Sequence, residues 1–135
     1  MVSPQDAAAF LAQRRIAVVG ASRSRSKYGN IVYRSLRSRG YDVLAVNPSA
    51  GAIEGDPCFR DLASLPGPVD AVIFIVPPAK TEVLLRDVAA LGIRHVWMQP
   101  GAESEAAVGF CEERGIRVVH GLCILVGPEA GSGGD

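Results

Sequence analysis

The chain has 135 residues, a length that suits one domain with its own hydrophobic core. Hydrophobic residues make up 48% of the sequence and charged residues 21%, a balance typical of globular proteins and not of disordered ones. Fourteen Lys and Arg residues balance fourteen Asp and Glu residues, and the resulting zero net charge argues against a general nucleic-acid binder.

The N-terminal segment carries Asp6 and has no basic stretch ahead of an apolar one, so we expect no signal peptide. The longest apolar run, residues 71–76, is far shorter than the roughly 20 residues of a membrane span. We therefore expect a cytoplasmic protein that does not enter a membrane.

Helical and extended patterns alternate along the chain. Helices are indicated by apolar residues three and four positions apart, and by a glycine such as Gly40 where the pattern ends. Strands are indicated by short β-branched runs that end in glycine or proline. In chain order, the sequence predicts a helix at 7–13, a strand at 15–20, a helix at 28–39, strands at 42–47 and 70–76, a helix at 81–91, a strand at 94–98, a helix at 103–114 and a strand at 116–120.

The predicted strands are apolar throughout and alternate with helices, which is typical of a parallel sheet covered on both faces. Because crossovers between parallel strands are right-handed, we predict a doubly wound, Rossmann-like α/β fold. Its five-stranded parallel sheet would carry helices on both faces. Residues 50–68 are expected to form a longer connection with a helical turn at 59–63. We expect one domain at 1–126 and a flexible tail at 127–135.

The segment after the first predicted strand is rich in glycine, hydroxyls and cations. In a doubly wound sheet, ligands bind outside the carboxyl ends of the strands, and this segment also leads into a helix N-terminus that favours anions. Gly20 would let a ligand approach the backbone, and Ser22 with nearby amides would donate hydrogen bonds. Arg23, Arg25 and Lys27 add positive charge. The pattern indicates a diphosphate site, and a solvated basic loop without a ligand is the alternative.

Basic charge is concentrated around this segment. Residues 14–39 contain eight basic side chains and no acid, so the rest of the chain carries a net charge of 0 − 8 = −8. A local asymmetry of this kind suits a small polyanion better than a long one.

The segments after the next three strands have two interpretations each. Asn47, before Pro48, stands where NAD-binding chains usually carry an acid, which counts against NAD without excluding NADP. Asn47 either holds a ribose or base, or caps the turn. Pro77 and Pro78 either offer adenine a rigid apolar wall or simply end the strand. The segment 99–101 either presents amides to a ligand or forms an ordinary strand-to-helix turn.

The sequence shows no evident catalytic pair. His120 follows a strand at its ligand-side end, but a turn-capping role is favoured. Cys123 lies near the same edge and could approach a ligand thiol, although a buried, inert thiol is favoured. The three cysteines form no CxxC pair and the chain has only two histidines, so we predict no catalytic residue and no metal site.

Several short segments in a fixed order carry a resemblance to a known family. They are residues 18–22 (VVGAS), the pair Tyr28 and Gly29, and residues 40–43, 46–48, 53–55, 64–65 and 69–72. The most specific segment is 96–101 (VWMQPG), followed by Gly115, Ile116 and Cys123. Over about residues 14–126 the chain resembles a family of small proteins made of a single CoA-binding domain. Its fold is similar to the N-terminal domain of the succinyl-CoA synthetase α subunit.

The resemblance implies that CoA binds along the C-terminal ends of the strands. Ser22 and the following loop would take the diphosphate, residues 47–48 and the turn at 76–77 would flank the adenosine, and residues 99–101 would lie on the pantetheine side. The candidate cofactor-binding residues are Gly20, Ala21, Ser22, Arg23, Arg25, Lys27, Tyr28, Asn47, Pro48, Val76, Pro77, Pro78, Gln99, Pro100 and Gly101.

The function expected from these features is binding of CoA or an acyl-CoA in the cytoplasm, without catalysis. The active-site phosphohistidine of the synthetase lies in a second domain that has no counterpart here, so the resemblance does not imply ligase activity. Two alternatives are an NADP- or acyl-CoA-dependent enzyme and a regulatory subunit that senses a nucleotide. Self-association or a partner protein remains open, whereas nucleic acid and membranes are not expected as partners.

Overall fold

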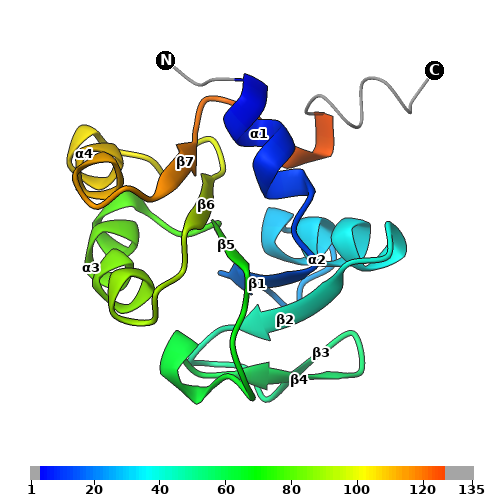
Figure 1. Cartoon of the computed structure of the whole chain (residues 1–135). Helices are drawn as coiled ribbons and strands as arrows, with labels where there is room; N and C mark the ends of the chain where they lie inside the picture. Colours follow the sequence, from blue (N-terminus) through cyan, green and yellow to red (C-terminus); the bar gives the residue numbers. More distant parts are fainter. Residues whose placement is uncertain (1–3, 127–135) are drawn as a thin grey trace.

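The computed structural model describes residues 4–126, and the tail expected at 127–135 lies outside this range. Helices and strands alternate as Figure 1 shows. The elements are α1 (Pro4–Leu11), β1 (Arg15–Val19), α2 (Tyr28–Ser38), β2 (Asp42–Val46), β3 (Ala52–Ile53), β4 (Asp56–Phe59), the 3₁₀ helix η1 (Leu62–Ser64), β5 (Ala71–Phe74), α3 (Pro78–Ala90), β6 (His95–Met98), α4 (Glu105–Glu113), β7 (Arg117–Val119) and the 3₁₀ helix η2 (Ile124–Val126). None of the helices in the described range is long and apolar enough to cross a membrane.

The sheet has seven strands in the order β3-β4-β2-β1-β5-β6-β7. All neighbours pair in parallel except β3 and β4, which are antiparallel. The predicted Rossmann-like α/β fold is confirmed, but the prediction of five strands is wrong. The two additional strands form a hairpin within the segment expected to be a long connection.

The hairpin explains the error in the strand count. Its turn is the pair Glu54 and Gly55, whose φ angles are 51° and 82°, as a tight two-residue hairpin requires. β3 has two residues and β4 has four, so neither is long enough to show an alternating pattern. β4 then adds to the edge of β2 through the pairs Ala45–Cys58 and Val46–Phe59.

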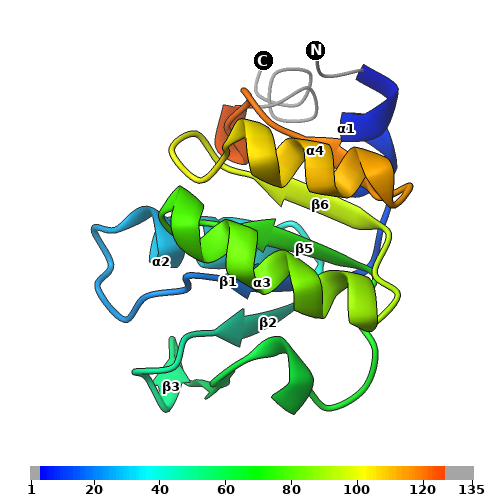
Figure 2. The ribbon, with the colours of Figure 1, turned by 90° about the vertical axis from the view of Figure 1, so that its left-hand side faces the viewer.

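Helices cover both faces of the sheet, as expected. Helices α3 and α4 lie on one face and α1 and α2 on the other (Figures 1 and 2). β1 is apolar from Ile16 to Val19 because successive side chains of a strand point to opposite faces, and helices cover both faces here. Ala17 and Val19 pack in the core beneath α3 and α4, whereas Ile16 and Val18 pack in the core beneath α1 and α2.

The start of α3 brings an additional turn of helix to the ligand-side edge of the sheet. The sequence pattern placed this start at Thr81, but the helix begins at Pro78, with Pro77 as its N-cap. Proline is tolerated in the first helical turn because the amide it lacks would have no intrahelical partner there. Lys80 therefore lies in the first turn of α3 and not in a loop.

Candidate functional site

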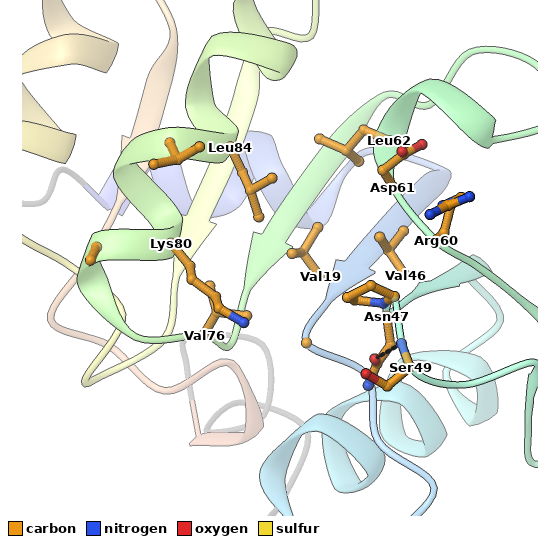
Figure 3. A pocket seen from close by; sticks show the side chains of 14 residues that line it. Val19, Val46, Asn47, Ser49, Arg60, Asp61, Leu62, Val76, Lys80 and Leu84 are labelled. Atoms are coloured by element: carbon orange, nitrogen blue, oxygen red, sulfur yellow. Dashed lines mark hydrogen bonds between the residues drawn. The ribbon is translucent and has the colours of Figure 1, made fainter.

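The C-terminal ends of the parallel strands lie along one edge of the molecule, at the left in Figure 2. A cavity of about 570 Å³ opens at this edge, beyond the ends of β1, β2 and β5. Figure 3 shows it between the first turns of α3 and the segment that follows β4. Its lining residues are Val19, Gly20, Val46, Asn47, Pro48, Ser49, Arg60, Asp61, Leu62, Val76, Ala79, Lys80, Val83 and Leu84.

The cavity has mainly apolar walls and two basic side chains at its rim. Lys80 reaches it from α3, and Arg60 lies on the opposite side, next to η1 (Figure 3). Both side chains are exposed, and neither forms an ion pair with any residue between 4 and 126. Asp61 is engaged locally, because its Oδ1 accepts hydrogen bonds from the Ser64 backbone N–H at 2.9 Å and from the Ser64 hydroxyl at 2.6 Å. The two cations are thus available to an anionic ligand.

Asn47 joins the end of β2 to the end of β1. Its Nδ2 donates to the Ala21 carbonyl at 2.7 Å, and its Oδ1 accepts from the Ser49 backbone N–H at 2.7 Å. The Ser49 contact is the turn-capping role that the sequence left open. The side chain also lines the cavity. Asn47 therefore fixes the shape of this part of the cavity.

Two glycines bring the loop after β1 and helix α2 into close contact. Gly20 has a φ of 99°, and a Cβ at this position would lie 2.2 Å from the Ile75 carbonyl oxygen. A Cβ on Gly29 would lie 2.0 Å from the Gly20 carbonyl oxygen. Glycine is therefore required at both positions by backbone packing, before any ligand is considered. The N-terminus of α2 consequently lies directly against the end of β1.

The cations of the loop after β1 differ in their surroundings. Arg25 forms an ion pair with Glu54 across 3.5 Å, between Nε and Oε2. Arg23 and Lys27 are exposed and have no ion-pair partner in the described part of the chain. The Ser22 hydroxyl accepts a hydrogen bond from the Ser24 backbone N–H at 3.0 Å, which tightens the loop.

The residues after β6 are engaged with other parts of the protein. Gln99 is 4% exposed, its Oε1 accepts from the Ile124 backbone N–H at 2.7 Å, and its Nε2 lies 3.3 Å from the Cys123 sulfur. The Gly101 backbone N–H donates to the Glu103 carboxylate at 2.8 Å. The Gln99 side chain thus fixes the turn before η2, and the amide of Gly101 already has an acceptor.

Four of the predicted binding residues line the cavity: Gly20, Asn47, Pro48 and Val76. The others lie along the same edge but outside the lining. They are Ala21, Ser22, Arg23, Arg25, Lys27 and Tyr28 in the loop and at the start of α2, Pro77 and Pro78 at the start of α3, and Gln99, Pro100 and Gly101 after β6. The structure therefore divides the predicted residues into those that line the cavity and those that lie outside it along the same edge.

Sequence reasoning missed the basic rim of the cavity. Lys80 would have been found by starting α3 at Pro78, because its first turn then follows a strand at the ligand-side end. No local pattern identifies Arg60, since its position depends on how the segment after β4 folds back over the sheet. The sequence pattern indicates an apolar helix face at Val83 and Leu84, but it does not show that both residues line a cavity.

Two cysteine thiols, Cys58 on β4 and Cys111 on α4, have pKa values above the usual value. Burial raises the pKa of the Cys58 thiol above its usual value. Burial also raises the pKa of Cys111 to about 12. Both thiols are therefore protonated at neutral pH. Between residues 4 and 126, no three His, Cys, Asp or Glu side chains are grouped so that they could hold a metal ion.

Comparison with known proteins shows that the chain is similar to a family of domains and to several single proteins. The family model described as CoA binding domain matches residues 14–128. A conserved hypothetical protein from Pyrococcus furiosus has a solved structure that is 43% identical, with a TM-score of 0.79, covering 84% of this chain and 97% of that one. An uncharacterized protein of Bacillus subtilis is 30% identical over 118 residues, covering 84% of each sequence.

A larger enzyme contains a similar region. The ADP-forming acetate–CoA ligase I of Archaeoglobus fulgidus is 29% identical over 119 residues, which cover 81% of this chain but only 17% of the ligase. The similarity is therefore confined to one part of that enzyme.

Proposed function

The chain belongs to the CoA binding domain family, and from this premise we propose that it binds CoA or an acyl-CoA at the C-terminal ends of β1, β2 and β5. The observation that carries the proposal is the cavity of about 570 Å³ with apolar walls and two cations, Lys80 and Arg60, that have no ion-pair partner among the described residues. Sites for small ligands commonly have volumes of about 300–1,000 Å³, apolar walls and a few well-placed polar groups.

The nucleotide end of CoA suits the two parts of this cavity. Val46, Val76 and Leu84 offer an apolar wall for the flat adenine ring. The ribose 3′-phosphate would then lie toward the rim, where Lys80 and Arg60 can pair with its oxygens. The N-terminus of α3 is close to the same rim and adds a favourable field for negative charge.

The diphosphate suits the adjoining loop. Gly20 lines the cavity and leads through Ser22 toward the N-terminus of α2. Free amides at a helix N-terminus favour phosphate, and Arg23 and Lys27 provide unpaired charge nearby. In our proposal, the pantetheine then continues past the end of β5 toward Pro100 and Gly101, which are exposed after the neighbouring strand β6.

We propose binding without turnover. Cys58 and Cys111 are held as neutral thiols, which are poor nucleophiles. The chain spans 17% of the related ligase, so ligase activity is not transferred to it. A role as a CoA carrier or sensor requires only the cavity and the loop.

Filling the cavity tests this proposal. Ala79 is exposed on α3 and lines the cavity, whereas Ala90 is exposed at the other end of the same helix and does not. Ala79→Trp should weaken CoA binding at least about tenfold in calorimetric titration, because the indole would occupy the space assigned to adenine. Ala90→Trp is the matched control and should bind CoA as the wild type does.

Two results would contradict the proposal. One is the absence of CoA binding by the folded wild-type protein. The other is unchanged CoA binding by folded Ala79→Trp, which would show that the ligand lies elsewhere. Thermal unfolding of both variants establishes that each is folded.

A further inference from the structure

Glu54 lies at an unusual position between the β3–β4 hairpin and α2. It is the first residue of the hairpin turn and has a φ of 51°, a conformation that glycine adopts more readily than glutamate. Its side chain is only 17% exposed. A half-buried carboxylate needs nearby partners, and the structure provides them from α2 and from the loop after β1.

The Glu54 carboxylate is bound by the groups that hold this loop. Its Oε2 accepts from Asn30 Nδ2 at 3.0 Å and lies 3.5 Å from Arg25 Nε. Asn30 is fully buried, and its Nδ2 also donates to the Ser22 carbonyl at 2.9 Å. One amide group thus joins the carboxylate to the loop that begins at Gly20.

Positive charge surrounds this carboxylate. Arg34 donates from Nε to Asn30 Oδ1 at 2.6 Å and from Nη2 to the Arg25 carbonyl at 3.1 Å. Arg37 donates from Nη1 to the Glu54 carbonyl at 3.2 Å. The hydrogen bond from Asn30 and the nearby arginines hold the pKa of Glu54 below its usual range. An anion therefore already resides beside the first turn of α2.

We propose that Glu54 is an internal competitor of the ligand: its carboxylate occupies Arg25 in the free protein, and the diphosphate of CoA displaces it from that arginine. This inference rests on the proposed function, because it assigns the diphosphate to the loop after β1. Arg25 is 67% exposed, and an ion pair that is open to solvent on one side is weakened by water, so Arg25 can exchange one anion for another at small cost. A diphosphate, with more charge and more acceptor oxygens, is the stronger partner.

The hairpin carries a matched control for this competition. Asp56 also pairs with an arginine, accepting from Arg37 Nη1 at 2.5 Å and from the Tyr33 hydroxyl at 2.6 Å. Both of these partners lie on α2, and within residues 4–126 Asp56 forms no hydrogen bond or ion pair with the loop that contains Arg25. Neutralising Asp56 removes the same charge from the same hairpin without releasing Arg25.

The experiment measures CoA affinity by calorimetry in four proteins and one double variant. The single variants are Glu54→Gln, Asp56→Asn and Arg25→Ala, compared with the wild type. Glutamine keeps an acceptor oxygen for Asn30 but removes the charge. Glu54→Gln should bind CoA about threefold more tightly than the wild type, the scale expected for one exposed ion pair. Asp56→Asn should change the affinity for CoA by less than about 1.5-fold.

The double variant Glu54→Gln/Arg25→Ala decides whether the gain passes through Arg25. We expect its affinity to equal that of Arg25→Ala, because no arginine remains to be released. The inference is overturned if Glu54→Gln binds CoA equally or more weakly, if Asp56→Asn gives the same gain, or if the gain persists without Arg25. These results leave the proposed function standing, whereas wild-type protein that fails to bind CoA contradicts the proposed function itself.

Discussion

Two basic regions flank the same edge of the sheet, and they differ in what their charges do. On the α2 side, Arg25 and Arg37 are paired with carboxylates of the β3–β4 hairpin. On the α3 side, Lys80 and Arg60 line a cavity and have no ion-pair partner within residues 4–126. In the free protein, these two arginines are engaged with the hairpin, whereas the two cations of the cavity are free to meet a ligand. Within the basic segment 14–39, Arg25 and Arg37 are therefore less available in the free protein than Lys80 and Arg60, whereas Arg23 and Lys27 are also unpaired among the described residues.

The largest effect should come from the packing on which the α2 side depends. Gly29→Ala places a Cβ well inside the van der Waals distance of the Gly20 carbonyl oxygen, so the variant should lose about 3 kcal/mol of stability, the upper end of typical overpacking costs. Gly109→Ala is the matched control, because Gly109 lies within helix α4 and a Cβ there meets nothing within 4 Å. The control should gain up to about 1 kcal/mol from better helix propensity. Urea unfolding measures both values, and equal stabilities would contradict the close contact.

The next effect separates the two basic regions by ligand binding. Lys80→Ala should weaken CoA binding about tenfold, because it would remove the charge-assisted contact that we propose between Lys80 and a phosphate of CoA. Arg37→Ala should change the affinity less than about twofold, since Arg37 is engaged with Asp56. Calorimetry at low salt makes this comparison. Similar losses in the two variants would show that Arg37 contributes to ligand binding as much as Lys80 does.

A smaller effect is expected where the two regions meet. Asn47→Ala removes the hydrogen bonds to the Ala21 carbonyl and the Ser49 amide, and should cost about 1–2 kcal/mol of stability. Ser49→Ala keeps the backbone amide that Asn47 binds and serves as the control. Thermal unfolding measures the difference, and an Asn47→Ala protein as stable as the control would mean that the loop is held in other ways.

The smallest effect concerns the pH dependence of the α2 side. The hydrogen bond from Tyr33, and then the interactions with Arg37, lower the pKa of Asp56 in the folded protein. The stability that Asp56 contributes is thus present above its unfolded pKa and is lost as the pH falls through the lowered folded value. Tyr33→Phe should raise this folded pKa and shift the loss of stability to higher pH. NMR titration of the Asp56 carboxyl checks the shift, and an unchanged pKa would contradict it.

The sequence predicted the central part of the fold because β1, β5 and β6 are apolar on both faces, a pattern that few structures other than a covered parallel sheet satisfy. It did not predict the β3–β4 hairpin, whose strands are too short to show a period. Gly55 is the one local signal of the turn, because glutamate is not among the residues that favour the positive φ that Glu54 adopts.

The candidate site was predicted in part for a related reason. Gly20 and Asn47 directly follow β1 and β2, and Val76 lies two residues past the end of β5, so the rule that ligands bind at strand ends identifies all three. Arg25 has the right charge, but a hairpin carboxylate far along the chain pairs with it. Arg60 reaches the cavity only through the path of the segment after β4, which no local pattern specifies.

The most direct test of the central claim asks whether the cavity cations recognise the 3′-phosphate of CoA. Calorimetric titrations of CoA, dephospho-CoA and NAD against the wild type and Lys80→Ala provide the comparison. We predict the affinity order CoA, then dephospho-CoA, then NAD for the wild type, with gaps that shrink in high salt. Lys80→Ala should remove most of the preference for CoA over dephospho-CoA. Equal wild-type affinities for these two ligands, or an unchanged preference in Lys80→Ala, would contradict the claim.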